Sequence, residues 1–179
     1  MKKVIHKLFW VWDFDKEEKW LNEMAAKGLC LTSAGFWTYE FEDCTPASYT
    51  IRLELLDKWP NHPESQKYIQ FVEETGAEQI SSVLRWVYFR KKTEDGVFDI
   101  FSDFDSRIQH LNRILTLIGI LSGFNLYIGI SYLYEFFVEG QMAMGISFLN
   151  LFAGLLGLYG FYRLFVKREN LKRERQIFE

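Results

Sequence analysis

The side chains that could bind a metal or take part in catalysis are few and scattered. The three histidines, His6, His62 and His110, are 56 and 48 residues apart, and none has a second ligand at the short spacing of zinc sites. His62 precedes Pro63, which favours a helix start over metal binding. The sequence contains no phosphate-binding glycine loop and no common hydrolase motif. We therefore expect no enzymatic activity, no metal, no cofactor and no catalytic residue.

The two cysteines are not expected to form a redox pair. Cys30 and Cys44 are 14 residues apart and do not form a CxxC motif. The segment that contains them is expected on the cytoplasmic side of a membrane, where thiols stay reduced. Two free thiols are the expectation.

Two further groups of charged residues allow a binding role but have simpler interpretations. Asp99, Asp103 and Asp105 could bind a divalent cation, but they lack the glycine and the final Glu of a calcium loop. Ser102 or Asp103 is the better candidate for capping a helix. Basic residues near position 90 could contact RNA, yet residues 1–102 carry 13 Lys/Arg and 17 Asp/Glu, which argues against nucleic acid as a partner.

Two long uncharged segments define the C-terminal half. The overall mean hydropathy of −0.10 resembles that of a soluble domain, but no charge occurs in the 21 residues 114–134 or in the 23 residues 140–162. A helix of that length spans roughly 30 Å, the thickness of a bilayer core. A buried core helix would normally carry a polar stripe. The pattern predicts a transmembrane hairpin.

Charge placement predicts the orientation of this hairpin. Basic residues flank both apolar segments, whereas the connection has Glu135 and Glu139 and no Lys or Arg. Basic flanks stay in the cytoplasm, so both termini are expected there, in a two-pass protein of the cell membrane. The expected segments are a cytoplasmic domain (1–102), a connecting helix (103–113), a first transmembrane helix (114–137), an extracytoplasmic loop (138–142), a second transmembrane helix (143–166) and a basic cytoplasmic tail (167–179).

The N-terminal domain is expected to belong to the α+β class. Residues 3–12, 29–42, 49–56 and 79–91 have strand-like patterns, with a possible short strand at 97–101. Helices are expected from about Asp15 to Gly28, with Glu18 in a capping box, and from Pro63 to Thr75. This order, βαββαβ, predicts a ferredoxin-like sandwich.

Such a sandwich leaves one sheet face uncovered. The first strand has large apolar residues on both faces, with Trp10 and Trp12 on the same one. These two tryptophans are a possible interaction surface. Self-association or a cover from the same chain is favoured over a ligand-binding surface, and the bilayer surface is a further alternative.

Small and polar residues in the apolar segments predict where the two helices touch. Gly119 and Gly123 form a GxxxG motif, and Ala143 begins a stripe of small residues on the second helix. Asn125 and Asn150 lie at similar depth, so they either pair across the hairpin or face a second protomer. The predicted contact residues are Gly119, Ser122, Gly123, Asn125, Gly129, Ser147, Asn150, Gly154 and Gly157.

The C-terminal tail is basic and is expected to lie along the membrane surface. Residues 163–179 have a net charge of +3, and each basic residue near an anionic leaflet contributes about 1 kcal/mol of attraction. The predicted anchor residues are Lys167, Arg168, Lys172, Arg173 and Arg175.

Three short motifs resemble the DUF2812 family of bacterial proteins of unknown function, commonest in Firmicutes. They are residues 20–28 (WLNEMAAKG), Tyr39-x-Phe41 and residues 88–91 (YFRK) before an acidic turn. The resemblance covers residues 1 to about 105. It implies C-terminal transmembrane helices, gene neighbourhoods with PadR-type regulators and no known catalytic residue. One departure is Ala77, which follows Gly76 where the family tends to have Trp. Trp59 or Trp86 is expected to fill the place of that Trp.

The resulting functional expectation is a membrane-anchored regulatory or accessory protein. Its cytoplasmic domain would act as an interaction or sensing module, linked to a PadR-type regulated membrane response. The alternative is a subunit of a membrane complex, or an immunity-type protein, in which the hairpin is the active part. The expected partners are membrane lipid and either a second copy of the chain or another membrane protein.

Overall fold

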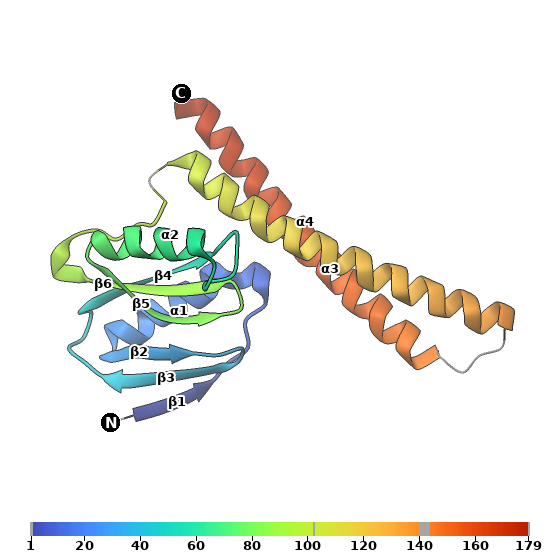
Figure 1. Cartoon of the computed structure of the whole chain (residues 1–179), viewed down its shortest axis with the longest axis horizontal. Helices are drawn as coiled ribbons and strands as arrows, with labels where there is room; N and C mark the ends of the chain where they lie inside the picture. The colour runs from blue at the N-terminus through green and yellow to red at the C-terminus, as the bar shows by residue number, and fades with distance from the viewer. Residues whose placement is uncertain (1, 102, 140–143, 179) are drawn as a thin grey trace. The chain divides into compact units, whose positions relative to one another are not determined.

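The chain forms two compact units, Met1–Ser102 and Asp103–Glu179. The structure is a computed structural model that describes residues 2–101, 103–139 and 144–178 (Figure 1). The first unit contains all six tryptophans and is α+β; the second consists of two long helices.

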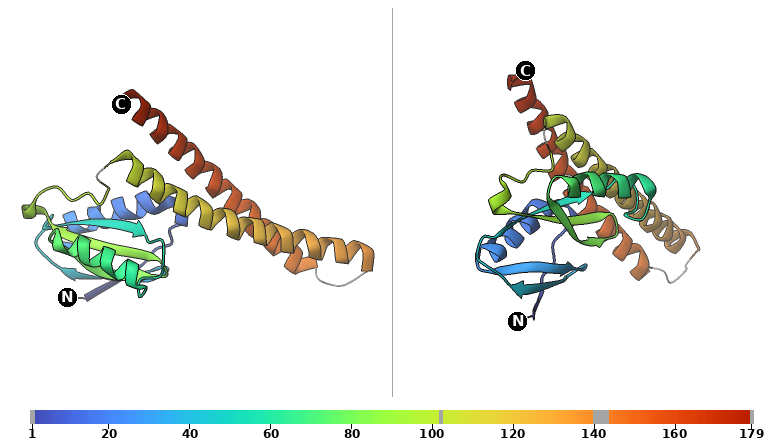
Figure 2. Two further views of the ribbon diagram at one scale, coloured as in Figure 1. Left: turned by 45° about the horizontal axis from the view of Figure 1, so that its top comes forward. Right: turned by 60° about the vertical axis from the view of Figure 1, so that its left-hand side comes forward.

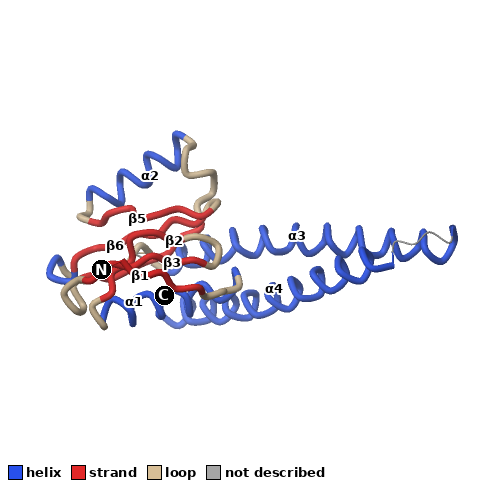
Figure 3. Tube along the Cα trace, turned by 90° about the horizontal axis from the view of Figure 1, so that it is seen from below, coloured by secondary structure: helices blue, strands red, loops and turns tan. Residues whose placement is uncertain are grey.

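The first unit contains two small antiparallel sheets of three strands each. The first sheet has the order β1-β3-β2 and the second has the order β4-β6-β5. Helix α2 lies outside β5 and β6, on the side away from β1 (Figures 1 and 3). The elements are β1 (Lys2–His6), the 3₁₀ turn η1 (Val11–Asp13), α1 (Phe14–Ala26), β2 (Leu29–Ala34), β3 (Thr38–Asp43), β4 (Tyr49–Leu55), α2 (Pro63–Glu74), β5 (Ala77–Val83), β6 (Trp86–Lys92) and the 3₁₀ turn η2 (Thr93–Asp95).

The two sheets are built as a structural repeat. Each is a β-α-β-β unit in which the last strand pairs with both others. Gly28 and Gly76 follow the two helices, 48 residues apart, and both have positive φ (80° and 88°), a backbone region that favours glycine. A register shift interrupts β2 between Leu31 and Ser33 and β5 at the equivalent positions. The two halves therefore have the same backbone features at equivalent positions.

This arrangement replaces the predicted ferredoxin-like topology. The segments 29–42 and 79–91, each predicted as one strand, are hairpins that turn at 35–37 and at 84–85. The second turn has no Gly or Pro, and Leu84 adopts a positive φ of 55°, which is rare for such a residue. The turn therefore could not be predicted from residue types. Residues 97–101 are not a strand, because Phe98 instead packs into the core beside α2.

The main core lies between the two repeats. Leu21 and Met24 of α1 pack with Leu31 and Phe41 from the first sheet and with Leu53 from the second. A second cluster packs under α2 and includes Ala77, Phe89 and Phe98. The aromatic rings of Phe89 and Phe98 thus occupy the surroundings of Ala77, whereas Trp59 is exposed and Trp86 packs against Phe14. Because the main core draws on both sheets, the repeats fold as one unit.

The second unit is a pair of long helices packed along one another, α3 (Phe104–Glu139) and α4 (Met144–Phe178) (Figure 2). The predicted connecting helix 103–113 and the first apolar segment are parts of α3, and α4 continues through the predicted tail to Phe178. Most of the predicted loop 138–142, together with Ala143, lies outside the described residues.

Candidate functional site

The most unusual chemical group in the first unit is a buried carboxylate between the repeats. Glu17 lies in the first turns of α1 and is 9% exposed. Its Oε1 accepts a hydrogen bond of 2.8 Å from the Tyr39 hydroxyl of the first sheet and one of 2.7 Å from the Tyr88 hydroxyl of the second. One carboxylate oxygen therefore joins α1 to a strand of each repeat.

Burial changes the protonation behaviour of all three groups. Loss of hydration raises the pKa of the Glu17 carboxyl, and the hydrogen bonds from Tyr88 and Tyr39 oppose that rise. The pKa of each tyrosine is raised by its own burial and then by the nearby Glu17 charge. The tyrosines therefore act as hydrogen-bond donors to Glu17 and keep their protons at neutral pH.

The free edge of β4 is covered by side chains of α1. Asn22 Nδ2 donates to the Ile51 carbonyl (2.9 Å), and the Ile51 amide donates to Asn22 Oδ1 (2.8 Å). Glu18, predicted in a capping box, instead accepts from the Leu53 amide (3.0 Å) and pairs with Arg52 (2.8 Å). Arg52 also donates to the Phe98 carbonyl (3.0 Å). Helix α1 thus takes the place of a further strand.

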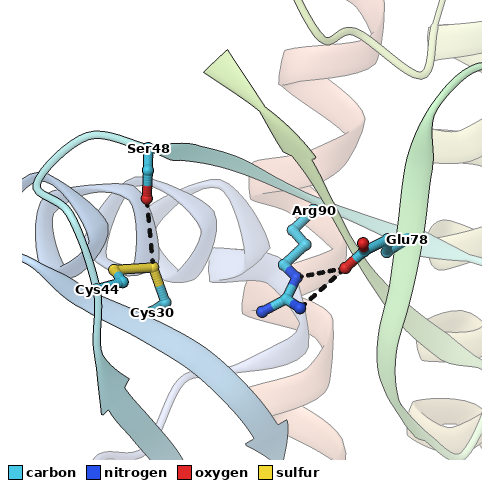
Figure 4. Close-up of a disulfide and its surroundings, with 5 residues drawn as sticks. All are labelled: Cys30, Cys44, Ser48, Glu78 and Arg90. Carbon is cyan, nitrogen blue, oxygen red and sulfur yellow. Dashed lines mark hydrogen bonds and ion pairs between the residues drawn. A yellow bond between two sulfur atoms is a disulfide. The ribbon is translucent and has the colours of Figure 1, made fainter. Parts of the chain in front are cut away.

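The prediction of two free thiols is wrong, because Cys30 and Cys44 form a disulfide (Figure 4). Cys30 lies on β2 opposite Glu42 of β3, and the chain continues from β3 to Cys44, so antiparallel pairing brings the cysteines to a Cα separation of 5.8 Å. That separation is normal for a disulfide. Disulfides are rare in the cytoplasm, so this bond stands against the predicted location of the unit.

Other predicted chemical groups have structural roles. His62 precedes α2 and its Nδ1 accepts a hydrogen bond from the Glu64 amide (3.2 Å), as expected for a helix start. Asp103 caps α3, since its Oδ1 accepts from the Ser106 amide (2.7 Å), and this bond lowers the pKa of the Asp103 carboxyl. Among the described residues, no group of three or more His, Cys, Asp or Glu is arranged to hold a metal ion.

The two tryptophans of the predicted interaction surface have different positions. Trp10 is exposed and its ring stacks on Trp12, with 5.1 Å between ring centroids, whereas Trp12 is buried. Trp10 is therefore the one of the two that presents its ring to the surface. Sequence periodicity missed the neighbouring exposed pair Phe36 and Trp37, because both lie in a turn of the hairpin that had been read as one strand.

Small residues line the contact between α3 and α4. A Cβ added to Gly129 would lie 2.7 Å from Leu151, and one added to Gly154 would lie 2.6 Å from Leu126. Ser147 Oγ donates to the Gly129 carbonyl (2.7 Å). The predicted contact residues that face the opposite helix are Gly119, Ser122, Gly129, Ser147, Gly154 and Gly157.

The remaining predicted contact residues are arranged differently. Nothing lies within 4 Å of a Cβ added to Gly123. The Asn125 amide donates to the Leu121 carbonyl and the Asn150 amide to the Ile146 carbonyl, each at 2.8 Å and each within its own helix. In the described part of the hairpin, the two asparagines are therefore not hydrogen-bonded to each other.

The basic residues after the second apolar segment make contacts within the hairpin. Arg175 pairs with Asp105 (2.6 Å), and Arg168 donates to Asn112 (3.1 Å) and pairs with Glu169 (2.8 Å). Lys172 also pairs with Glu169 (3.1 Å). Lys167 and Arg173 are exposed. Part of the basic charge is thus used to join the ends of α3 and α4.

Together these features define a class of protein with an α+β domain of two β-α-β-β repeats followed by a long helical pair. A family model, described as a protein of unknown function (DUF2812), matches residues 13–122. The chain belongs to the DUF2812 family. The match begins at Asp13, directly before α1, and ends at Ser122 in α3. It therefore starts later and ends later than the resemblance read from the motifs, which covers residues 1 to about 105. No curated protein and no solved structure matches the chain.

Proposed function

We propose that this chain is a non-enzymatic, two-pass membrane protein whose hairpin anchors a cytoplasmic interaction module. The main support is the surface of the helical pair. Both helices are long and apolar enough to cross a membrane, yet large side chains such as Phe124, Phe152 and Leu155 are more than half exposed. A core helix of a soluble protein would bury such side chains, whereas lipid would cover them here.

The contact between the helices also supports this proposal. In a bilayer, apolar side chains gain little by leaving lipid, so transmembrane helices associate through small residues that permit close approach. Gly129, Ser147 and Gly154 lie at this contact. Many large apolar side chains of the two helices, such as Phe124 and Phe152, are exposed, whereas others, such as Ile114 and Leu164, are buried. The positive-inside rule supports cytoplasmic termini, while the disulfide argues for the opposite side.

The proposed role of the first unit is to bind a protein partner as an accessory or regulatory module, in line with the PadR-type association of its family. The polar side chains described above make hydrogen bonds within the unit: Glu17 accepts from two tyrosines, and Glu18 and Asn22 bind the main chain of β4. Exposed aromatic residues such as Trp37 and Trp59 are what it offers to a partner.

A second candidate function places the activity in the hairpin, as a subunit of a membrane complex. The open space beside Gly123 favours it, because a small residue outside the hairpin contact allows another helix to approach closely. In this case the first unit would regulate or stabilise the complex.

Tagged co-purification from mildly solubilised native membranes distinguishes the two candidates. The matched control replaces residues 103–179 with an unrelated two-helix anchor. The proposal predicts that the partner is retained by the anchor-swapped chain. A stoichiometric partner that is lost on swapping the hairpin would contradict it and support the membrane-complex function.

A further inference from the structure

The two repeats are joined inside the chain by a contact between a helix and the edge of a strand. Helix α1 packs in the core against both sheets, whereas α2 packs in the core against the second sheet. At the edge of β4, Asn22 of α1 binds the Ile51 amide and carbonyl, and Glu18 accepts from the Leu53 amide. The helix of the first repeat thus covers the first strand of the second repeat. We call this contact the repeat interface.

Helix α2 has matching residues at the positions that form the repeat interface in α1. The offset of 48 residues between Gly28 and Gly76 aligns the two helices. Buried positions of α1 then match buried positions of α2, and the two residues of the repeat interface match exposed glutamines. Glutamine carries the same amide group as asparagine, so it can bind a strand edge in the same way. The aligned pairs are Glu17 and Ser65, Glu18 and Gln66, Leu21 and Ile69, Asn22 and Gln70, and Met24 and Val72.

Strand β1 is the matching edge at the other end of the unit, since it ends the first sheet as β4 ends the second. Strands β3 and β6 correspond with the same offset of 48 residues, as the register shifts of their partners show. Pairing with these strands therefore puts Lys2 and Val4 of β1 in the places that Ile51 and Leu53 have in β4. Leu53 is buried, whereas Val4 is 52% exposed.

The other strands that end a sheet are covered. Helix α1 covers β4, and β2 and β5 meet through the Ser81 hydroxyl, which accepts from the Ala34 amide (3.2 Å) and donates to the Ala34 carbonyl (3.1 Å). Among the described residues of the first unit, the edge of β1 is the sheet end that stays exposed. An exposed edge is a template for pairing with another chain.

We propose that a second copy of the chain covers this edge, with β1 of one copy seated on α2 of the next. The repeat interface then continues from chain to chain. Strand β1 and helix α2 lie at opposite ends of the first unit (Figures 1 and 3), so the contact is head-to-tail. The inference rests on the proposed interaction role of the first unit and adds a surface distinct from its exposed aromatic residues.

Charge favours α2 over a second β1 strand as the partner of this edge. Lys2 and Lys3 of one β1 strand would repel those of another, which is how lysines protect sheet edges. Lys2 lies 3.8 Å from Glu42 of its own sheet, and Lys3 takes the place of Arg52, the cation of the repeat interface. Helix α2 carries three Glu and one Lys, so it attracts such a cation.

The present contacts of the two glutamines do not prevent this docking. The Gln70 amide donates to Glu74 (3.3 Å), and the Gln66 amide donates to the Pro60 carbonyl (2.6 Å). Both bonds are exposed, so water already competes with them and exchange for a strand edge costs little.

Cross-linking of two singly substituted chains tests the head-to-tail contact. Lys3 and Gln66 have the places of Arg52 and Glu18, whose side chains lie 2.8 Å apart. A short bismaleimide should therefore join a Lys3→Cys chain to a Gln66→Cys chain when the two, with different tags, are co-expressed in one membrane. We expect mixed dimers at least tenfold more abundant than dimers of either chain with itself. The control is the parent chain, whose own cysteines form the disulfide.

Two other results would overturn the proposal. Dimers of the Lys3→Cys chain with itself, as abundant as mixed dimers, would mean that β1 edges pair with each other. Absence of any dimer would leave the edge to a different partner.

Variants at the edge of β1 separate docking from folding. The Val4 amide corresponds to the Leu53 amide, which points away from the sheet, so Val4→Pro should retain pairing with β3. It should lower the yield of mixed dimers about tenfold, because an acceptor on α2 loses its donor. Val4→Ile keeps the amide and should leave the yield unchanged. Equal yields from the two variants would overturn the proposal.

Opposite charges at one exposed position of α2 provide a second test that does not alter β1. Gln70→Arg should lower the yield of mixed dimers several-fold, since it faces Lys2 of the next copy, whereas Gln70→Glu should retain or raise the yield. The same yield from both chains would contradict the placement of β1 on α2.

Replacement of residues 103–179 by an unrelated two-helix anchor in both chains separates this inference from the proposed function. Mixed dimers with either anchor support both. Mixed dimers that form only with the native hairpin support the head-to-tail contact and contradict an interaction module that acts without the hairpin. Absence of mixed dimers with both anchors, while a co-purified partner is retained, overturns the head-to-tail contact alone.

Discussion

The Asn22 side chain and the Ile51 main chain are joined by two hydrogen bonds, one in each direction, at 2.9 and 2.8 Å. This is the pattern by which a neighbouring strand would pair with β4. Because β4 ends its sheet, an unpaired edge would otherwise be open to another chain. Helix α1 of the first repeat therefore completes the sheet of the second repeat.

Asn22→Ala should destabilise the first unit by about 1–3 kcal/mol, because the Ile51 amide and carbonyl lose partners at a part-buried site. Asn22→Asp should also destabilise, since it retains the acceptor but loses the donor. Denaturant unfolding of the detergent-solubilised chain, followed by tryptophan fluorescence, measures the change. Asn61→Ala, at an exposed loop position, is the control and should have no effect; equal stability of Asn22→Ala and the parent would contradict the role of Asn22.

Glu17 should make the stability of the first unit depend on pH. Its pKa is raised in the folded chain, so the folded state favours the protonated carboxyl. This contribution is greatest below the pKa of the unfolded chain and is lost as pH rises through the folded pKa. The stability of the parent chain relative to Glu17→Gln should therefore fall as pH increases from 4 to 7.

Tyr88→Phe is the matched variant for Glu17. Removal of a hydrogen bond that lowers the Glu17 pKa should raise that pKa further and extend the fall in stability to higher pH. Unfolding measured at several pH values compares the three chains. A constant difference between the parent and Glu17→Gln across this range would contradict the raised pKa.

Gly154→Ala should weaken the helical pair, because its Cβ would lie 2.6 Å from the Leu126 side chain and 3.1 Å from the Leu126 amide nitrogen. Such overpacking costs about 1–3 kcal/mol. The midpoint of thermal loss of helical circular dichroism in mild detergent gives the effect. Gly123→Ala adds the same methyl group to open space and should leave the midpoint unchanged; the reverse ranking would mean that the two helices pack by another face.

The Cys30–Cys44 disulfide should stabilise the first unit by about 3 kcal/mol, the value expected for a closed loop of this length. Unfolding with and without dithiothreitol tests this. The parent should lose stability in reductant, whereas the Cys30→Ser/Cys44→Ser chain should be insensitive to it. An equal response of both chains would show that the bond contributes nothing.

The predictability of the molecule follows the strength of the local signal. The uncharged segments and Pro63 gave long or sharply bounded patterns, so α3, α4 and the start of α2 could be predicted. The turn at Leu84 could not be predicted, because the hairpin imposes its positive φ and none of the residue types typical of turns occurs there. The hydrogen bonds of Glu17 could not be predicted from the sequence either, since Tyr39 and Tyr88 belong to different repeats and come together only when the two sheets pack. The disulfide likewise depends on strand pairing rather than on spacing.

Cysteine labelling in intact expressing cells tests the orientation of the hairpin directly. In a Cys30→Ser/Cys44→Ser background, Phe137→Cys and Ile177→Cys place single thiols at equally exposed positions, 76% and 79%. With both termini in the cytoplasm, a membrane-impermeant maleimide should label position 137 in intact cells and position 177 only after the membrane is opened. Labelling of position 177 alone in intact cells would contradict it and place the disulfide-bonded unit outside.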